Sequence, residues 1–217
     1  MQNSLTIAIV GGTGNLVGAL TLRLGAPGVK IIIGSRDAEK AKKAVETLKP
    51  SLRGGEIEGM TNQAAVKGAD FVVIAVPYEG HVQMVTDLKG QLAGKVVIDT
   101  VVPLNKGRPF VPPAGSALQE AQQILAGEAP VVGALHNISA VDMSDVDAPL
   151  GDVLVCGDNA EAKQKVMEII KRIGALAFDG GPAGNAYVIE GLTGVIIYLN
   201  RKYKSKHGSI KIIGIRE

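Results

Sequence analysis

A glycine-rich turn close to the N-terminus restricts the choice of fold more than any other segment of this chain. Residues 5–10 are apolar and predict a strand, and Gly11-Gly12-Thr13-Gly14 follows them directly. The next segment, 16–24, has the apolar spacing of a helix. A strand, a glycine-rich turn and a helix in this order are typical of a dinucleotide-binding fold, in which the helix N-terminus offers free N–H groups to a pyrophosphate.

Two of these glycines take the leading positions of the Gly-x-Gly-x-x-Gly fingerprint. Gly12 is expected to make the tight turn, and Gly14 is expected to let the pyrophosphate approach the backbone. The third position holds Val17, and the next glycine, Gly18, comes one residue later. This departure predicts that the first helix packs on the sheet differently from the standard motif, while the prediction of a bound dinucleotide is unchanged.

The remaining sequence alternates apolar runs with helical segments, which is the pattern of successive βαβ units. Strands are expected at 30–33, 57–60, 70–76, 95–102, 131–135, 153–156 and 175–178, and helices at 38–48, 62–67, 80–88, 116–125, 160–173 and 186–203. The chain has no Trp, four Tyr and three Phe, so its core must consist of small aliphatic residues, as in parallel sheets buried on both faces. We predict an α/β fold, a Rossmann-like doubly wound and mainly parallel sheet that continues to about residue 180, with a small C-terminal helical extension.

The end of the second strand predicts which dinucleotide is bound. An enzyme that uses NAD usually has Asp or Glu there, bonded to the ribose 2′-hydroxyl. This chain instead has Ser35 and Arg36, with Lys40 one helical turn later. A hydroxyl and two cations suit a 2′-phosphate, because charge-assisted hydrogen bonds to phosphate are strong and Arg can form two of them. We therefore predict NADP rather than NAD.

The distribution of charge makes a nucleic-acid partner an unfavourable interpretation. The net charge is +2, and six basic residues gather in 201–217 with a single acid, Glu217. Only Tyr203 lies beside them, whereas nucleic-acid sites combine basic patches with several stacking aromatics. A solvated tail is expected, with contact to an anionic ligand as the alternative.

The single cysteine and the lack of long apolar runs exclude further classes. Cys156 lies in an apolar run, is expected to be buried and inert, and cannot form an internal disulfide or a multi-cysteine metal site. No metal site is predicted. No apolar run reaches the ~18–20 residues of a membrane span, and no secretory leader is evident. We expect a cytoplasmic protein with no membrane partner.

The last predicted helix, 186–203, carries a stripe of apolar residues at helical spacing, namely Val188, Leu192, Val195, Ile196 and Leu199. Gly191 and Gly194 lie within it, and glycine allows another backbone or a flat ring to come close. The helix could close the core, contact the cofactor or join a second subunit. Because an exposed apolar stripe usually marks an interface, we predict a homodimer.

Four further segments narrow the interpretation: Ala75-Val76-Pro77-Tyr78-Glu79, Val102-Pro103, Ala134-Leu135-His136-Asn137-Ile138-Ser139-Ala140 and Val155-Cys156-Gly157-Asp158. Together with the glycine turn and Gly34-Ser35-Arg36, they resemble the NADPH-dependent coenzyme F420 reductases, also called F420H2:NADP oxidoreductases. The resemblance covers nearly the whole chain. It implies hydride transfer between C4 of the nicotinamide of NADP(H) and C5 of an 8-hydroxy-5-deazaflavin, coenzyme F420.

The resemblance also implies roles for individual residues. The pyrophosphate would be held by Thr13, Gly14, Asn15 and Leu16, the 2′-phosphate by Ser35, Arg36 and Lys40, and the nicotinamide with its ribose by Tyr78, Val102 and Ala140. Val76 and Pro77 end a strand at the carboxyl edge of the sheet, where ligands bind, and would add to the floor of the nicotinamide site. Residues 1–130 would form the dinucleotide-binding domain, and 131–217 would complete the sheet, the deazaflavin site and the dimer contact.

Three histidines and one buried acid leave alternatives open. His136 ends an apolar strand and either donates a hydrogen bond to the deazaflavin or is a structural histidine, whereas His81 and His207 are expected at the surface. Asp99 would bond backbone amides at its strand end or orient a ligand.

Other functions remain compatible with this sequence. They are an NADPH-dependent reductase of another acceptor, such as ferric ion, a flavin or an imine, and a non-catalytic NADP-binding sensor or scaffold. Lys106 and Arg108 lie in a proline-rich loop and could attract the anionic tail of the deazaflavin.

Overall fold

The computed structural model describes residues 5–215, so Arg216 and Glu217 of the basic run lie outside the described residues. The strands are β1 (Leu5–Val10), β2 (Val29–Ser35), β3 (Glu56–Thr61), β4 (Phe71–Ile74), β5 (Val96–Asp99), β6 (Leu104–Asn105), β7 (Arg108–Pro109), β8 (Val131–Gly133), β9 (Val153–Val155) and β10 (Ala177–Asp179). The helices are α1 (Asn15–Leu24), α2 (Ala38–Leu48), α3 (Asn62–Lys67), α4 (His81–Leu92), α5 (Ala117–Leu125), α6 (Ala140–Ser144), α7 (Ala160–Arg172) and α8 (Ala186–Lys202). Three 3₁₀ turns are η1 (Lys49–Ser51), η2 (Tyr78–Gly80) and η3 (Ala183–Asn185).

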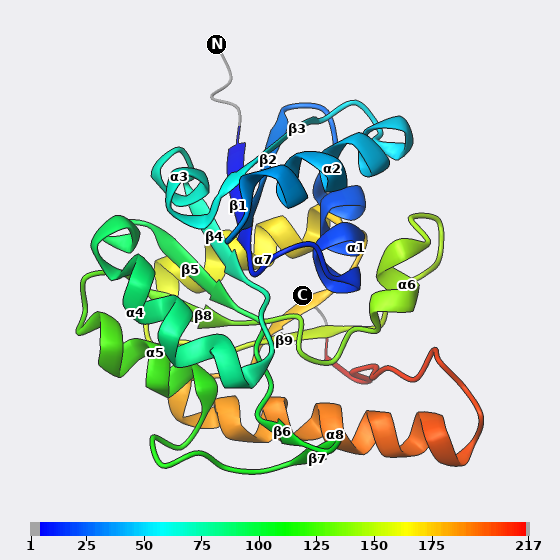
Figure 1. The fold of residues 1–217 in the computed structure, drawn as a ribbon. Coiled ribbons are helices and arrows are strands. Elements are labelled where there is room, and N and C mark those ends of the chain that lie inside the picture. The colour runs from blue at the N-terminus through cyan, green and yellow to red at the C-terminus, as the bar shows by residue number, and fades with distance from the viewer. Residues whose placement is uncertain (1–4, 216–217) are drawn as a thin grey trace.

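The main sheet is six-stranded and parallel, in the order β3-β2-β1-β4-β5-β8. Ile7 of β1 pairs with Ile31 of β2 on one side and with Phe71 of β4 on the other. The chain builds outward from β1 in one direction and then, from β4, in the other (Figure 1). The order therefore reverses between β1 and β4, and the carboxyl ends of these two strands form the switch point at which open α/β sheets bind ligands.

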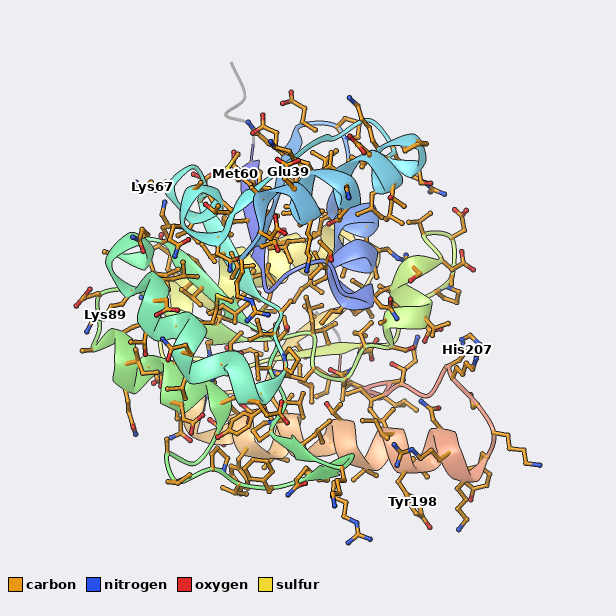
Figure 2. The ribbon with its side chains drawn as sticks, viewed as in Figure 1. Glu39, Met60, Lys67, Lys89, Tyr198 and His207 are labelled. Carbon is orange, nitrogen blue, oxygen red and sulfur yellow. The ribbon has the colours of Figure 1, made fainter. Side chains whose placement is uncertain are left out.

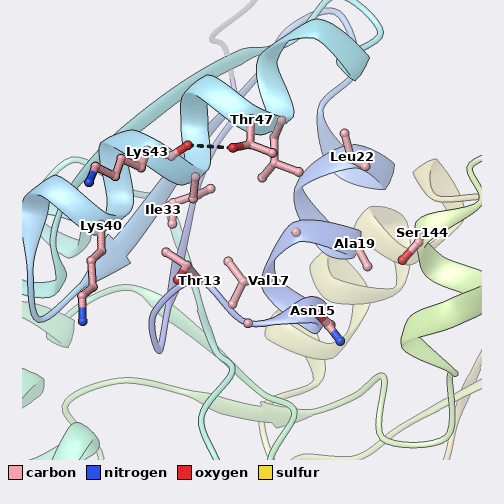
Figure 3. A pocket seen from close by; sticks show the side chains of 14 residues that line it. Thr13, Asn15, Val17, Ala19, Leu22, Ile33, Lys40, Lys43, Thr47 and Ser144 are labelled. Carbon is pink, nitrogen blue, oxygen red and sulfur yellow. Dashed lines mark hydrogen bonds between the residues drawn. The ribbon is translucent and has the colours of Figure 1, made fainter.

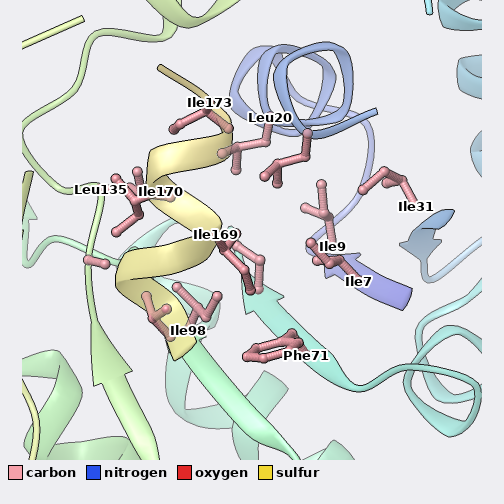
Figure 4. Close-up of a cluster of buried hydrophobic side chains, with 14 of the residues drawn as sticks. Ile7, Ile9, Leu20, Ile31, Phe71, Ile98, Leu135, Ile169, Ile170 and Ile173 are labelled. Atoms are coloured by element: carbon pink, nitrogen blue, oxygen red, sulfur yellow. The ribbon is translucent and has the colours of Figure 1, made fainter. Parts of the chain in front are cut away.

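Helices cover both faces of this sheet, as the strand sequences require. Ile7 and Ile9 of β1 pack into one cluster with α1 and α7 (Figure 4). Ala8 and Val10, which alternate with them, pack into a second cluster with α3, α4 and α5. Both clusters consist mainly of Ile, Val, Leu and Ala. The predicted Rossmann-like, doubly wound architecture is confirmed.

The prediction of one sheet continuing to about residue 180 is wrong in detail, because β9 and β10 form a separate parallel pair. They are joined to the main sheet through an isolated antiparallel bridge between Gly133 and Cys156. The predicted loop after β5 contains the short antiparallel hairpin β6–β7, and α6 is a helix that the sequence did not indicate. These differences depend on pairing between distant segments, which local periodicity does not encode.

Helix α8 lies on the side of the molecule toward which the main strands end (Figure 1). Thr193 of α8 donates a hydrogen bond to the carbonyl of His136, just after β8, at 2.8 Å. At Gly194 a Cβ would come within 2.4 Å of the ring of Pro109, so glycine lets the β6–β7 hairpin rest on the helix. No helix within residues 5–215 combines the length and the apolar character needed to cross a membrane.

The segment after α8 is not a free tail. The backbone N–H of Asp152 donates to the carbonyl of Ile210 at 3.0 Å, and the N–H of Ile212 donates to the Asp152 carboxylate at 2.6 Å. The hydroxyl of Ser139 also donates to the carbonyl of Lys206 at 2.9 Å. The basic side chains from Arg201 to Lys206 are exposed as expected, but the backbone that follows them docks beside α6.

Candidate active site

The turn after β1 is fixed by two glycines with positive φ. Gly11 has φ +129°, and a Cβ there would lie 2.3 Å from the carbonyl oxygen of Ala75, just after β4. Gly12 has φ +98°, and its N–H donates to the carbonyl of Gly34 at 3.1 Å. Only glycine adopts these angles without strain, so the turn is held against the ends of both neighbouring strands. The sequence predicts the tight turn at Gly12, whereas the close contact of Gly11 with Ala75 could not be predicted from it.

The next residues leave the N-terminus of α1 open. Gly14 is the N-cap residue, and within residues 5–215 no side chain caps the first turn of the helix. A Cβ at Gly12 or Gly14 would meet nothing within 4 Å. Thr13, Gly14 and Asn15 are exposed, and Leu16 is half-buried. Free N–H groups and the positive end of the helix dipole therefore face open space, which suits a pyrophosphate.

The valine at the third fingerprint position is accommodated by the core. Val17 is buried among the residues of α1, β1 and α7. Gly18 turns toward α2, where a Cβ would lie 3.6 Å from Leu48, an ordinary contact. The different packing expected for α1 thus places a side chain into the core where the standard motif has none.

At the end of β2 the predicted phosphate ligands have different surroundings. Ser35 is buried, and its hydroxyl accepts a hydrogen bond from the N–H of Asp37 at 3.3 Å. The Asp37 carboxylate in turn caps α2 by accepting from the N–H of Glu39 at 2.9 Å. Arg36 and Lys40 are exposed, and neither forms an ion pair with any residue in 5–215. The carboxylate of Asp37 is thus engaged by the N-terminus of α2, whereas Arg36 and Lys40 are available to bind an anion.

A pocket of about 550 Å³ lies between α1 and α2 and reaches α6. It brings together four of the residues expected from the sequence, Thr13, Gly14, Asn15 and Lys40, while Ser35 and Arg36 are not among its lining residues. Figure 3 shows that Lys40 and Lys43 both project from α2 beside it. Lys43 was not singled out from the sequence, although its spacing from Lys40 places both on one side of the helix.

The residues expected around the nicotinamide lie on the loops after β4 and β5 and at the start of α6. Val76, Tyr78, Val102 and Ala140 are half-buried, and Pro77 is exposed. The loops after β4 and β5 are joined by Thr100, whose hydroxyl donates to the carbonyl of Ile74 at 2.8 Å. Both loops therefore lie at the carboxyl edge of the sheet, next to the turn after β1.

His136 follows β8 at the same edge. The preceding Leu135 has φ +67°, a left-handed conformation that is uncommon for leucine and turns the chain sharply. His136 is 5% exposed, and neither ring nitrogen has a hydrogen-bond partner within residues 5–215. Burial lowers its pKa to about 4, so the ring is neutral at neutral pH and carries one N–H donor. A buried donor without a partner fits a ligand-binding group, and its role stays a prediction.

The prediction that His81 lies at the surface is wrong. His81 is fully buried, and its Nε2 lies 2.7 Å from Oδ2 of Asp99. His81 begins an apolar stripe of α4 with Val85, Leu88 and Leu92, a spacing from which its burial could have been predicted. Asp99 also accepts from the N–H of Val101 at 2.9 Å, which is the backbone-bonding alternative.

The third histidine, His207, is exposed as expected, with 68% of its side chain accessible to solvent, and it pairs with Asp142.

The side chain of Arg23 on α1 binds the loop around α6 through several hydrogen bonds. The Arg23 guanidinium donates to the carbonyls of Asp142 at 2.8 Å, Met143 at 3.3 Å, Val146 at 3.0 Å, Ala148 at 2.7 Å and Ile173 at 3.4 Å, and also to that of Asp145. Ser144 belongs to this loop and also lines the pocket between α1 and α2. The guanidinium of Arg23 therefore positions one wall of the site.

Comparison with known proteins identifies the family of this chain. The family model described as NADP oxidoreductase, coenzyme F420-dependent, matches residues 6–103. An F420-dependent NADP reductase from Methanocaldococcus jannaschii is 40% identical, over 97% of this chain and 99% of that protein. One from Methanothermobacter thermautotrophicus is 34% identical, over 98% of this chain and 97% of that protein.

Among solved structures, one from Arthrobacter sp. FB24, provisionally assigned as an F420-dependent NADP reductase, superposes with a TM-score of 0.83. It has 25% sequence identity and covers 96% of this chain and 99% of its own. The sequence matches extend over nearly the full length of each protein, and the open glycine turn and the strand-end loops lie within them. This chain belongs to the F420-dependent NADP reductase family.

Proposed function

We propose that this protein transfers a hydride between NADP(H) and coenzyme F420. The observation that carries the proposal is the open N-terminus of α1 at the switch point between β1 and β4, in a chain whose family is named for this reaction. When bound, NADPH supplies the hydride and the oxidised deazaflavin accepts it. The protein's own residues bind the two coenzymes, orient them and exclude water.

The phosphates of NADP(H) would be bound at two places. The backbone N–H groups from Thr13 to Leu16 donate to the pyrophosphate. They are free to do so because no side chain within residues 5–215 caps the N-terminus of α1. Arg36 and Lys40 bind the 2′-phosphate as exposed cations without ion pairs in 5–215. Ser35 contributes mainly by holding the turn that presents them.

The nicotinamide end would lie against Val76, Pro77, Tyr78, Val102 and Ala140, on the loops at the carboxyl edge of the sheet. We propose that residues 1–130 bind the dinucleotide, and that 131–217 add the deazaflavin side of the site. The support for this division is that α8 and the strand end after β8 approach the same edge.

His136 would donate a hydrogen bond to the deazaflavin. The ring nitrogens are buried without partners in 5–215, and the neutral imidazole keeps an N–H donor over the whole neutral pH range. Such a donor stabilises charge that develops on the acceptor ring. We expect His136→Phe to slow F420 reduction by about 10–100-fold, the effect of losing one hydrogen bond to a charged group, while leaving the Kd of NADPH unchanged. Equal activity of the variant and the wild type would leave His136 as a structural histidine.

The direct test mixes the protein with NADPH and oxidised F420 and follows the loss of the visible absorbance of the deazaflavin. Bleaching with NADPH and not with NADH supports both the reaction and the 2′-phosphate site. Bleaching with both cofactors supports the reaction but contradicts the proposed binding of the 2′-phosphate by Arg36 and Lys40. NADPH binding without bleaching rejects the proposal, and a panel of ferric, flavin and imine acceptors then separates another reductase from a protein that only binds NADP.

We also propose that the protein is a homodimer that joins through α8, and that it is cytoplasmic. The apolar residues Tyr187, Val188, Val195, Tyr198 and Leu199 are 43–61% exposed along one stripe of this helix. Tyr198 points away from the body of the protein (Figure 2). Light scattering of the wild type should give twice the monomer mass, and Val195→Glu should give the monomer mass. A wild type with the mass of a monomer would contradict the dimer. Cell fractionation tests the location, and recovery outside the cytoplasmic fraction would contradict it.

A further inference from the structure

A connected group of polar side chains lies under the two loops that border the proposed nicotinamide site. It consists of Tyr78 from η2, His81 from α4, Asp99 from β5 and Glu120 from α5. The side chains of His81 and Asp99 are fully buried, and that of Glu120 is 13% exposed. Charged groups are rarely buried unless they are paired, so the contacts within this group decide what it can do.

The contacts form one chain from the loop after β5 to the loop after β4. Asp99 accepts from the N–H of Val101 through Oδ1, at 2.9 Å, and faces Nε2 of His81 through Oδ2, at 2.7 Å. On the other side of the imidazole, Nδ1 lies 3.8 Å from Oε2 of Glu120, an ion-pair distance too long for a hydrogen bond, and neither atom has a hydrogen-bond partner within residues 5–215. The second oxygen of Glu120 accepts from the hydroxyl of Tyr78 at 3.0 Å. The imidazole is therefore the link between the two loops.

The arrangement favours the protonated form of His81. A neutral imidazole that donates to Asp99 carries no charge toward Glu120, whereas the imidazolium donates to Asp99 and attracts the Glu120 carboxylate through its positive charge. Burial lowers the pKa of His81, but the charge of Asp99, the hydrogen bond to Asp99 and the charge of Glu120 outweigh it and hold the pKa above its ordinary value. Glu190, whose own pKa is raised to about 8, adds to this only where it is ionised. The hydroxyl of Tyr78 stays protonated, because burial and the bond to Glu120 raise its pKa to about 12.

The group also sets the position of an aromatic ring. The ring of Tyr78 stacks on that of His81 with centroids 6.4 Å apart and meets Phe110 edge-on at 5.1 Å. With its hydroxyl bonded to Glu120, the half-buried Tyr78 is held at three points. A side chain of this kind suits a floor or wall against which a flat heterocycle is placed.

We infer that His81 is a positioning residue for the nicotinamide end of NADPH: as an imidazolium it holds Asp99 and Glu120, and through them the 99–103 loop and the ring of Tyr78. The inference rests on the proposed function, because it takes Tyr78 and Val102 as the lining of the nicotinamide site. His81 does not touch the ligand. Loss of its charge releases the contact with Glu120 and loosens the lining.

The test compares two ligands that share their phosphate end. NADPH contains the nicotinamide, whereas 2′,5′-ADP carries the 2′-phosphate and adenosine without it. We expect His81→Asn to weaken NADPH about tenfold, or about 1.4 kcal/mol, and to leave the Kd of 2′,5′-ADP within about twofold. Equal weakening of both ligands means general damage to the fold and overturns the inference, as does no effect on either.

The pH dependence of the preference for NADPH over 2′,5′-ADP is a second test, because a purely structural role of His81 would not change this preference with pH. The chain has three histidines, so their ring-proton NMR signals can be assigned by variants. In the wild type, the preference for NADPH over 2′,5′-ADP should fall as pH rises through the titration of His81. A preference that is flat across that titration overturns the inference. A protein that keeps this preference but does not reduce F420 rejects only the proposed reaction.

A second variant guards against failure of His81→Asn to fold. Glu120→Gln keeps an acceptor for Tyr78 but removes the charge that faces Nδ1 of His81. It should lower the pKa of His81 measured by NMR and shift the fall in NADPH preference to lower pH by the same amount. Glu79→Gln, an exposed neighbour with the same loss of charge, is the matched control and should shift neither. Equal shifts in both variants would overturn the inference.

Discussion

Replacing Gly11 or Gly14 with Ala separates what the glycine turn does for the fold from what it does for ligand binding. Gly11 has φ +129°, and a Cβ there would lie 2.3 Å from the carbonyl oxygen of Ala75 and 2.8 Å from Cγ1 of Val76. Gly14 has φ −72° and ψ 169°, and a Cβ there would meet nothing within 4 Å. The same methyl group therefore clashes with the sheet at one position and faces open space at the other.

The expected losses of stability differ accordingly. Gly11→Ala combines a strained backbone, about 1–3 kcal/mol, with overpacking against a strand end, about 1–3 kcal/mol. The sum of about 2–6 kcal/mol is a large part of the roughly 5–15 kcal/mol that holds a domain together. At about 2–4 °C per kcal/mol, Tm should fall by roughly 4–24 °C. Gly14→Ala replaces one N-cap residue by a poorer one and should cost at most about 1 kcal/mol.

Thermal unfolding and NADPH titration of both variants test this reasoning. Gly14→Ala should fold almost as well as the wild type and bind NADPH at least about tenfold more weakly, because its methyl group occupies the space beside the free N–H groups of α1. Two results would refute the argument. One is a loss of stability in Gly14→Ala as large as in Gly11→Ala. The other is unchanged NADPH affinity in a folded Gly14→Ala, since the dinucleotide would then not approach this helix terminus.

Three more substitutions or measurements address separate parts of the structure. Arg36→Ser should lower the preference for NADPH over NADH in kcat/KM by about 10–100-fold, the effect of about 1.5–3 kcal/mol for hydrogen bonds to a charged group, and an unchanged ratio would place the 2′-phosphate elsewhere. Burial raises the pKa of Glu190 from 4.5 to about 8, although the N–H groups of Ala117 and Leu118 oppose this. The folded state then keeps a proton that the unfolded chain has lost, so stability should decrease between about pH 5 and 8, and Glu190→Gln should flatten that part of the Tm profile. Burial also raises the pKa of Cys156 to about 11, so iodoacetamide at neutral pH should label it only after unfolding, and rapid labelling of the native protein would contradict its burial.

The sequence predicted those parts of the fold that depend on local signals. The glycine turn, the helix from Ala38 to Leu48 and the short helix from Asn62 to Lys67 lie where expected, because caps, turns and periodicity mark them directly. The helix that begins after Ser116 is capped by the hydroxyl of that residue, which accepts from the N–H of Gln119 at 3.0 Å. Such features need no information from distant parts of the chain.

The parts that were missed depend on contacts between distant residues. The apolar stripe of α4 could have indicated that His81 is buried, but its partner Asp99, at the end of β5, could not be identified from the sequence. The pair β9–β10 separates from the main sheet because β8 meets it only through the bridge at Gly133. For the site, the residue types that suit phosphate could be read from the sequence, whereas the open space above Gly14 and the unpartnered ring of His136 are properties of the assembled structure.

The hydrogen bonds of the Arg23 guanidinium affect which part of the protein can open locally in the native state. Within residues 141–150 only Met143 is buried, so the guanidinium from α1 supplies much of what holds this segment in place, together with the pairs Asp142–His207 and Asp147–Arg53. Amide exchange there can proceed by detachment of this segment alone, without opening of the sheet. The wall around Ser144 would then open and close as a unit of low local stability, while the buried end of β1, before the glycine turn, keeps the protection of the core.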